Sequence, residues 1–389
     1  MMRIARDVAG PCLAPHGSVL AVGALDGLHR GHQALLARVR ERAAALSLPP
    51  LAISFEPLPR AYFSRTPLPR LGSVRDKIEG LARAGMQRLL LLRFNAALAA
   101  LPAEDFVRRV LLARAGAREV WVGEDFRFGH RRSGDLALLR RMGAELGFAA
   151  HALETHLHDG ARISSSAIRA ALTADDFAAA AVLLGHPFCI GGRVVRGQQL
   201  GRSLGYPTAN IRLGRRVSPI QGIFAVRVYG ATESVWPGGR SGVSCDRREC
   251  RAARDTGASL PGGRSGASCA RDTGASLPGG RSGASCARDT GASLPGGRSG
   301  ASCARDTGAS LPGVASLGLR PTVGGHEPLL EAHLFDFNGD LYGRHLAVEF
   351  VRKLRDEEKF ASLDDLTRQM HRDAAAARAL LGLPLSVSA

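Results

Sequence analysis

Short apolar runs alternate with helical patterns over the first half of the chain. The runs have strand length, and the stretches between them repeat apolar residues every three to four positions, as amphipathic helices do. The expected strands are 18–23, 51–55, 88–92, 119–122 and 148–153. The expected helices are 32–46, 74–85, 103–116 and 134–147. This alternation predicts an α/β fold, with a Rossmann-like parallel sheet covered by helices on both faces.

The second half has a different texture, in which glycines separate runs rich in β-branched residues. These runs are 191–197, 222–230, 313–320, 329–337 and 345–351. They predict a small antiparallel β-barrel, and the helical pattern at 362–382 predicts a C-terminal helix after it. We therefore expect two domains, at 1–185 and 186–389.

A tandem repeat interrupts the second half. The unit "GGRSGASCARDTGASLP" occurs at 262–278, 279–295 and 296–312, after a longer degenerate copy at 238–261. Each unit has one leucine and no aromatic residue, too little apolar surface to offset the entropy of ordering it. We expect a disordered, low-complexity insert at about 232–313, in the loop of a hairpin between two barrel strands.

Charge and composition narrow the function classes. A net charge of +17 indicates anionic partners such as nucleotides or nucleic acid. Aromatic residues are only 5% of the chain and are absent from the repeats, so stacking platforms for single strands are missing and nucleic acid is disfavoured. No apolar run reaches the roughly 20 residues that span a bilayer, and the first residues do not resemble a signal peptide. A cytoplasmic enzyme without a membrane partner is expected; oligomeric state is left open.

The stretch "VGALDGLHRGHQ" at 22–33 joins an expected strand directly to an expected helix. Ligands of open α/β sheets bind beyond the carboxyl ends of the strands, where a helix N-terminus favours phosphate. His29 and His32 could then donate hydrogen bonds to charge that develops on an α-phosphate. A phosphate could also approach the neighbouring Gly23, Asp26 and Gly31. The alternative is that the two histidines only cap the helix or face solvent.

Three other segments carry candidate phosphate ligands. At a probable helix start, the expected phosphate-binding residues are Ser164, Ser165, Ser166 and Arg169, although serine there could be an N-cap alone. A flexible loop suited to lie against phosphates contains Gly197, Gly201 and Gly205. After it, Thr208 and Asn210 offer hard oxygen ligands for Mg²⁺, or simply form a turn. In an alternating run, Glu331 shares a strand face with His333, where a glutamate is usually an outward-facing polar residue.

Several ordered motifs together resemble the bacterial bifunctional riboflavin kinase/FMN adenylyltransferase (FAD synthetase) family. In the first half these are "GALDGLHRGH", "FEPLPR", "VGEDFRFGHRRSGD" and "RISSSAIRAAL". In the second half they are "GRVVRGQQLGRSLGYPTANI", "EPLLEAHLFDFNGDLYG" and "VEFVRKLRDEEKF". The resemblance covers essentially the whole chain except the insert.

The resemblance implies that riboflavin is phosphorylated by ATP to FMN in the barrel. FMN is then adenylylated by a second ATP in the first domain, giving FAD and pyrophosphate, with Mg²⁺ at both steps. It implies that Glu331 is the kinase base and that Thr208 and Asn210 hold the kinase metal. Arg127 and His130 become expected nucleotide or flavin contacts.

Three departures from the family pattern bear on these expectations. Leu25 stands where phenylalanine is usual, and Asp125 stands where some relatives carry asparagine, which adds a charge near the FMN phosphate. The insert could impair the kinase half, leaving only the FMN-to-FAD step.

Two alternative functions from other classes remain open. The first is a nucleotidyltransferase for another small molecule with a non-catalytic barrel. The second is a nucleic-acid-binding protein that uses its arginine-rich repeats.

Overall fold

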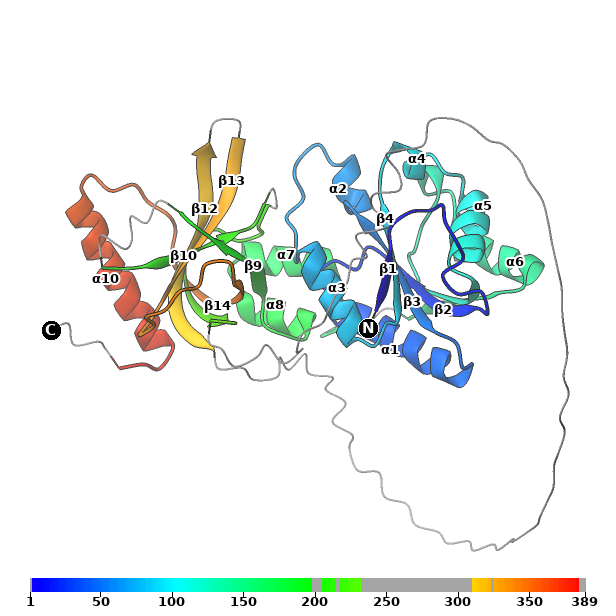
Figure 1. Ribbon diagram of the computed structural model, residues 1–389, viewed down its shortest axis with the longest axis horizontal. Helices are drawn as coiled ribbons and strands as arrows, with labels where there is room; N and C mark the ends of the chain where they lie inside the picture. Colours follow the sequence, from blue (N-terminus) through cyan, green and yellow to red (C-terminus); the bar gives the residue numbers. More distant parts are fainter. Residues whose placement is uncertain are drawn as a thin grey trace, which may run out of the picture. The chain divides into compact units, whose positions relative to one another are not determined.

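The first half of the chain forms a six-stranded sheet in which every neighbouring pair is parallel (Figure 1). The computed structural model describes residues 2–154, 156–197, 205–214, 217–231, 310–322 and 325–384. The strands are β1 (Arg3–Ala5), β2 (Ser18–Val22), β3 (Pro50–Glu56), β4 (Arg88–Arg93), β5 (Ala117–Gly123) and β6 (Ala149–Leu153). Their order in the sheet is β1-β4-β3-β2-β5-β6. Five strands coincide with the expected runs, and β1 is an added edge strand.

Helices cover both faces of this sheet because the buried strands are apolar on both sides. In β2, Val19 and Ala21 pack with α1 and α3, whereas Leu20 and Val22 pack with a π-helix and α6. The helices among the sheet strands are α1 (Arg30–Ala45), α2 (Pro59–Phe63), α3 (Val74–Arg83), α4 (Ala96–Ala99), α5 (Ala103–Asp105), the π-helix (Phe106–Arg114), a 3-10 helix (His130–Arg132) and α6 (Leu136–Leu146). The helix expected at 103–116 is thus one α-turn followed by a π-helix.

The strand order reverses at β2, since β3 and β4 lie on one side of it and β5 and β6 on the other. Such a switch point leaves a crevice at the carboxyl ends of the central strands, where α/β proteins bind ligands. The segment that leaves β2 at this crevice is the turn that leads to His29 and the start of α1.

The second half forms a closed six-stranded barrel whose neighbouring strands are all antiparallel. Its strands are β9 (Cys189–Val195), β10 (Thr208–Arg212), β11 (Gly222–Tyr229), β12 (Leu311–Thr322), β13 (Gly325–Leu334) and β14 (His345–Arg355). They close in the order β10-β13-β12-β11-β14-β9. The expected combination of a parallel α/β sheet and an antiparallel barrel is confirmed.

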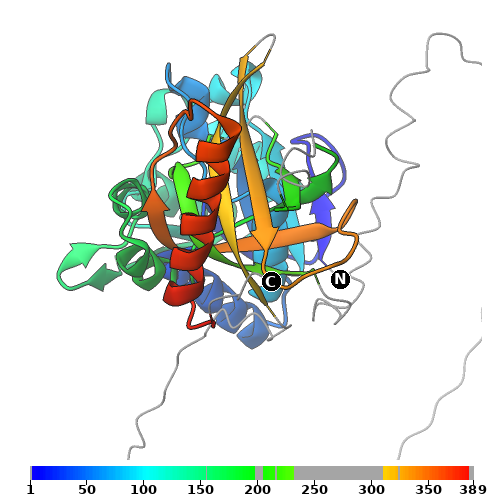
Figure 2. The same cartoon turned by 90° about the vertical axis from the view of Figure 1, so that its left-hand side faces the viewer.

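The C-terminal helix α10 (Leu363–Leu380) packs on the outside of the barrel. It contacts β11, β12 and β14, and Ala377 is buried against Ala225 and Phe335. Figure 2 shows this helix in red across the barrel strands. The helix predicted at the end of the chain is therefore confirmed.

The insert joins β11 to β12, which are neighbouring antiparallel strands. Their pairing runs without a register shift from Gly222 opposite Leu317 to Val228 opposite Leu311. The hairpin expected around the insert is confirmed, and its register is regular up to the last pair before the loop. The expected disorder falls on residues 232–309, which lie outside the described part of the chain.

A short ribbon and two helices connect the sheet to the barrel. The ribbon pairs β7 (Leu157–His158) with β8 (Ala161–Arg162), and α7 (Ser165–Thr173) and α8 (Phe177–Leu184) follow it. Ile168 and Leu172 of α7 belong to the same apolar cluster as the barrel residues Phe224 and Leu330. The helix that begins beside the sheet thus ends in the core of the barrel. Within the described residues, no helix is long and apolar enough to cross a membrane.

Candidate active sites

Two stacked imidazoles occupy the start of α1. The His29 and His32 rings lie 3.7 Å apart between centroids, with 20° between their planes. His29 is the N-cap residue, and its Nδ1 accepts the backbone N–H of His32 at 3.4 Å. Because Nδ1 is the acceptor, a neutral ring carries its proton on Nε2. The capping alternative is therefore real, yet it leaves an Nε2–H donor on His29.

Electrostatics keep both rings neutral. Burial, reinforced by the charges of Arg162 and Arg169, lowers the pKa of His29 to about 4. Burial also lowers the pKa of His32 well below its usual value, and the neighbouring His29 and Lys77 act in the same direction. The His32 Nδ1 atom is buried and has no hydrogen-bond partner among the described residues. As neutral imidazoles, the two rings carry no positive charge, and each still has one N–H that can donate a hydrogen bond.

Asp26, in the same turn, anchors a cluster of buried charges. The residue is only 3% exposed, and its Oδ2 accepts hydrogen bonds from Arg169 Nη2 and from the backbone N–H of Leu71. Arg70 Nε lies 3.7 Å from Oδ1, and the Arg70 guanidinium also pairs with both carboxylate oxygens of Glu56 at 2.8 and 3.0 Å. Burial raises the pKa of Asp26, against the lowering effect of the two arginines. The carboxylate of Asp26 is held by these guanidinium groups and by the Leu71 backbone, and these contacts fix the orientation of the turn that contains Asp26.

The serines expected to hold phosphate lie at the start of α7. Ser164 is the N-cap residue and accepts the backbone N–H of Ala167 at 3.1 Å. Ser165 donates to the Asp26 backbone carbonyl at 3.1 Å, which joins α7 to the histidine turn. Ser166 accepts from the exposed side chain of Arg60 at 2.9 Å. The N-terminus of α7 is thus held beside the turn, with arginine at its edge.

Asp125 forms an ion pair with Arg162 at 2.7 Å. The hydrogen bond from Arg162 holds the pKa of Asp125 below its usual value. Arg162 lies immediately before the "ISSSAIR" segment and also acts on His29. The extra negative charge noted in the sequence is therefore paired with a neighbouring arginine.

Arg127 and His130 lie in the loop after β5. Phe128 and Gly134 form an isolated antiparallel bridge that closes this loop. Arg127 is 3.8 Å from Asp135, and His130 Nδ1 lies 3.2 Å from the Ala99 carbonyl. These contacts fix the two residues to their own loop and to α4 rather than to the Asp26 cluster.

Exposed aromatic residues follow the carboxyl end of β3. The α2 residues Tyr62 and Phe63 both pack edge-on against Phe94, at centroid distances of 5.3 and 5.7 Å. Phe63 is 67% exposed, a large apolar surface left open at the edge of the sheet where ligands bind. Sequence analysis missed this group because the three residues come from segments that only the fold brings together.

The barrel carries a second polar cluster on its outer face. In the pairing of β10 with β13, Asn210 lies opposite Glu331 and Thr208 lies opposite His333. Residues opposite each other in an antiparallel pair share a face, and so do alternate residues of one strand. The intervening Ala209 and Leu330 are buried in the barrel core, so these four polar residues project outward. The structure brings Thr208, Asn210 and Glu331 together on one face of the barrel.

The side-chain oxygen of Asn210 is buried and could serve as a metal ligand. It is 5% exposed, and its Oδ1 is buried without a hydrogen-bond partner among the described residues. Such an atom normally has a partner, because an unpaired buried acceptor costs free energy. Gly197 lies so close that an added Cβ would be 2.5 Å from this oxygen. An oxygen donor held in a tight cradle beside the Thr208 hydroxyl fits the ligand preference of Mg²⁺.

Comparison with known proteins identifies the family to which the chain belongs. Family models match residues 13–167 (FAD synthetase) and residues 184–381 (riboflavin kinase). A bifunctional riboflavin kinase/FMN adenylyltransferase from Escherichia coli (strain K12) is 37% identical over 384 residues, which covers 98% of this chain and 99% of that protein. The chain belongs to this family.

Other relatives of the bifunctional family agree. A bifunctional riboflavin kinase/FMN adenylyltransferase from Pseudomonas fluorescens is 38% identical and covers 94% of this chain and 93% of that protein. A solved structure from Streptococcus pneumoniae, titled as a macrolide-efflux protein, has a TM-score of 0.65 and covers 96% of this chain and 97% of its own. At 23% identity, that structure supports the fold alone.

Membership in the bifunctional family confirms the predicted function. The chain is a riboflavin kinase and FMN adenylyltransferase, with ATP as co-substrate and FMN and FAD as products. Nothing supports the alternative that the insert leaves only the second step. The continuous register of the hairpin that bears the insert is consistent with an intact kinase barrel.

The remaining expected kinase residues are only partly described. Gly205 has a left-handed φ of 81°, and no atom of the described residues lies within 4 Å of a Cβ added there, whereas Gly201 lies outside the described part of the chain. Sequence analysis missed Glu357, which accepts a hydrogen bond from Ser316 at 3.0 Å. Ser316 lies directly opposite Glu331, so a second carboxylate adjoins the proposed base. The sequence signal for Glu357 was the motif "RDEEKF", but the sequence alone could not show which of its three acidic residues lies near Glu331.

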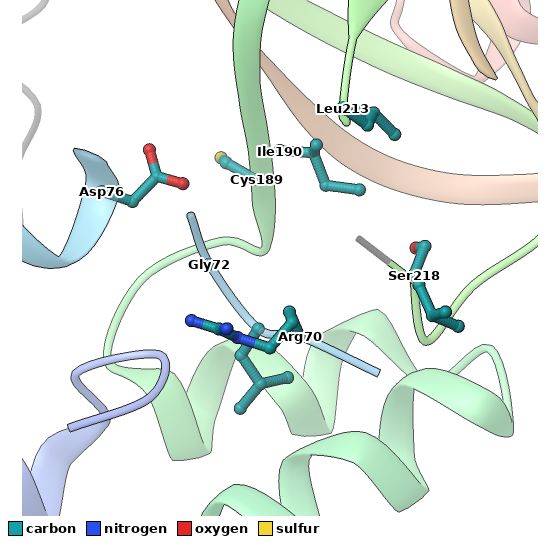
Figure 3. A pocket seen from close by; sticks show the side chains of 9 residues that line it. Arg70, Gly72, Asp76, Cys189, Ile190, Leu213 and Ser218 are labelled. Carbon is teal, nitrogen blue, oxygen red and sulfur yellow. The ribbon is translucent and has the colours of Figure 1, made fainter. Parts of the chain in front are cut away.

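A small cavity lies beside the Asp26 cluster (Figure 3). It measures about 20 Å³, room for about one water molecule and far below the roughly 300 Å³ of a typical ligand site. It is lined by Arg70, Leu71, Gly72, Asp76, Cys189, Ile190, Leu213, Val217 and Ser218. The Arg70 backbone N–H donates to the Val217 carbonyl at 2.9 Å, so this arginine ties the site to the segment between β10 and β11.

Proposed function

We propose that the two reactions of this bifunctional enzyme are carried out by the two polar clusters described above. The pair His29 and His32 serves adenylyl transfer, and Glu331 with Asn210 serves phosphorylation. The observation that carries the proposal is placement: one cluster lies at the switch point of the sheet, and the other covers one outer face of the barrel. The two reactions therefore use separate sites in one chain.

In the adenylylation step, an oxygen of the FMN phosphate attacks the α-phosphorus of ATP. A P–O bond forms, the bond to the bridging oxygen of the β-phosphate breaks, and pyrophosphate leaves. His29, through Nε2–H, and His32 donate hydrogen bonds to the α-phosphate oxygens as charge builds on them. Each neutral imidazole keeps one N–H at neutral pH, so both rings remain hydrogen-bond donors there.

The surroundings of the histidines orient the substrates. We assign Gly23 and Gly31 to close approach of phosphate, and the start of α7, with Ser164, Ser165 and Ser166, to the leaving pyrophosphate. Asp26 and Arg169 hold each other and thereby fix the turn. Arg127 and His130 remain proposed flavin or nucleotide contacts, and the exposed Phe63 is suited to stack against a planar ring.

In the phosphorylation step, Glu331 accepts the proton of the riboflavin 5′-hydroxyl, whose oxygen attacks the γ-phosphorus of ATP, and ADP leaves. Thr208 Oγ1 and Asn210 Oδ1 would hold Mg²⁺, supported by the unpaired buried oxygen of Asn210. When bound, the metal neutralises phosphate charge. Gly197 and Gly205 flank the ATP phosphates. The cytoplasmic location and the domain boundary near residue 185 stay predictions.

Two variants of the full chain test this division. The substrates are riboflavin or FMN with ATP and Mg²⁺, and the flavins are separated by chromatography. Glu331→Gln should abolish FMN formation from riboflavin while added FMN still becomes FAD. His29→Asn should make FMN from riboflavin but convert little of it to FAD. If either variant loses the other activity instead, the assignment of clusters to reactions is wrong.

A further inference from the structure

Lys77 is a buried lysine that the mechanism above does not use. It lies near the start of α3, and only 4% of its surface is exposed. Its Nζ donates hydrogen bonds to the Ala24 carbonyl at 2.9 Å, to Ser54 Oγ at 3.1 Å and to the Phe55 carbonyl at 3.2 Å. Three acceptors match the three donors of an ammonium group. The charged form of Lys77 is therefore fully hydrogen-bonded.

Burying this ammonium is costly. Lysine is almost never fully buried without a partner, and removing an ammonium from water costs several kcal/mol. In the part of the chain that the structure describes, its hydrogen bonds go to two carbonyls and a hydroxyl, and none goes to a carboxylate. The packing of α3 does not require a buried ammonium group. We therefore look for its role in the segments that the Lys77 side chain connects.

Those segments are the end of β3 and the turn that follows β2. The turn has left-handed backbone at Leu25 (φ 49°), Gly27 (φ 77°) and Leu28 (φ 42°). A left-handed conformation is strained for a leucine, so surrounding contacts must impose it. The Ala24 carbonyl, one residue before Leu25, receives hydrogen bonds from both Lys77 and Ser54. This carbonyl is the point at which the strained turn is fastened to the sheet.

We propose that Lys77 is a positioning residue of the adenylyltransferase site: it fastens the Ala24 carbonyl to the end of β3 and so fixes the turn that presents His29 and His32 to the α-phosphate. The inference rests on the proposed role of the histidine pair. Lys77 acts through the turn and does not itself contact substrate.

The charged and titratable groups around Lys77 should make the rate of adenylylation depend on pH. Glu56 on β3, Asp26 in the turn, Arg70 before α3 and His32 on α1 surround it. Burial lowers the pKa of Lys77 to about 8, with Arg70 in the same direction and the two carboxylates opposing. Above that pH, a neutral amine has two N–H donors for three acceptors. Adenylylation should therefore fall on the alkaline side, whereas riboflavin phosphorylation in the same chain should not share this limb.

The test compares Lys77→Met and Lys77→Gln in the full chain, with FMN, ATP and Mg²⁺ as substrates. Lys77→Met should lower kcat for FAD formation about tenfold or more while KM for FMN changes by less than about threefold, since the loss falls on the transition state. Its alkaline limb near pH 8 should vanish. Lys77→Gln keeps a donor without the charge, so it should recover part of kcat at pH 7, also without the limb. Riboflavin phosphorylation should be unchanged in both.

Lys359→Met is the matched control, because it makes the same chemical change at an exposed lysine. It should leave FAD formation and its pH profile intact. If Lys77→Met does not give a native circular dichroism spectrum, the Lys77→Gln variant carries the test through its pH profile. Retention of the alkaline limb in a folded Lys77 variant, or an unchanged kcat, would overturn the proposal.

A double variant separates this inference from the proposal on which it rests. If His29→Asn alone leaves FAD formation intact, the role of the histidines fails. If His29→Asn is impaired but Lys77→Met is not, only the role of Lys77 fails. If both are right, adding Lys77→Met to His29→Asn should cost less than about threefold further, because residues that act as a unit are not additive.

Discussion

The close approach of Gly197 to Asn210 makes one substitution a direct probe of the metal site that we propose for the kinase reaction. A Cβ at position 197 would lie 2.4 Å from Asn210 Nδ2 and 2.5 Å from both Cγ and Oδ1. Non-bonded heavy atoms normally stay about 3.5 Å apart, so Gly197→Ala requires a shift of about 1 Å. β10 is hydrogen-bonded to β9 and β13 on its two sides, which leaves the Asn210 side chain as the part that moves.

A shift of that size should disable a magnesium ligand. Mg²⁺ demands near-ideal geometry with oxygens at about 2.0–2.1 Å, and metal–ligand distances tolerate only about 0.2 Å. A misplacement of about 1 Å in a positioning group can reduce a rate about 10²-fold. We therefore expect kcat/KM for riboflavin phosphorylation to fall about 10²-fold in Gly197→Ala, equivalent to about 3 kcal/mol.

The assay measures FMN formed from riboflavin and, separately, FAD formed from added FMN. The second activity should be unchanged, since Gly197 lies in the barrel half of the chain. Gly382→Ala is the control: its backbone is left-handed (φ 72°), but in the part of the chain that the structure describes no atom lies within 4 Å of the added Cβ. It introduces strain without a collision, and both activities should persist. Kinase activity within about threefold of the parent in folded Gly197→Ala would refute Asn210 as a ligand.

Three further predictions use other parts of the structure. Asp26→Ala leaves the mostly buried guanidinium group of Arg169 without its carboxylate, whereas Arg70 keeps Glu56, and should lower the free energy of unfolding in urea by about 3 kcal/mol; a loss below about 1 kcal/mol would contradict the pairing of Asp26 with Arg169. The pKa of His29 is about 4 in the folded chain against 6.5 in the unfolded chain, so between these values the unfolded chain binds more protons and stability falls as pH falls. His29→Asn should remove up to roughly 1 kcal/mol per pH unit of that slope in urea titrations between pH 7 and 5; an unchanged slope would mean that His29 titrates normally. Joining Ala231 directly to Ser310 leaves a four-residue loop between the paired ends of β11 and β12, a common hairpin length, so riboflavin phosphorylation should be unchanged; its loss would show that the insert is needed.

Much of the fold follows from local pattern, and the exceptions have physical causes. The inner sheet strands β2, β3, β4 and β5 were predictable because both of their faces are largely buried, which requires continuous apolar runs. β10 was not, because Thr208, Asn210 and Arg212 alternate with only two apolar residues, Ala209 and Ile211, after a proline. Its strand conformation comes from pairing with β9 and β13 on either side, and those partners are remote in sequence.

The same limit applies to the adenylyltransferase site. The histidine pair was predictable because strand, glycine turn and helix are contiguous in the chain. Lys77 was not, since a lysine within an amphipathic helix ordinarily faces solvent, and only the fold places it beneath the turn. Nor could the sequence show that the charge of Asp125 is neutralised by Arg162, because the two residues lie on separate loops that meet only in the folded chain.

The helix α7 is shared by the two halves of the chain. Its first turn adjoins Asp26 and Arg60 at the adenylyltransferase site, while Ile168 and Leu172 complete the apolar interior of the barrel. A gene-shuffling event that cut the chain at residue 185 would leave those side chains, with Leu184, facing water on one fragment and open a gap in the other. Each such residue forfeits about 2 kcal/mol when exposed. Selection on either activity therefore acts on a helix that the other activity also needs, so the two catalysts must evolve together although their chemistries are independent.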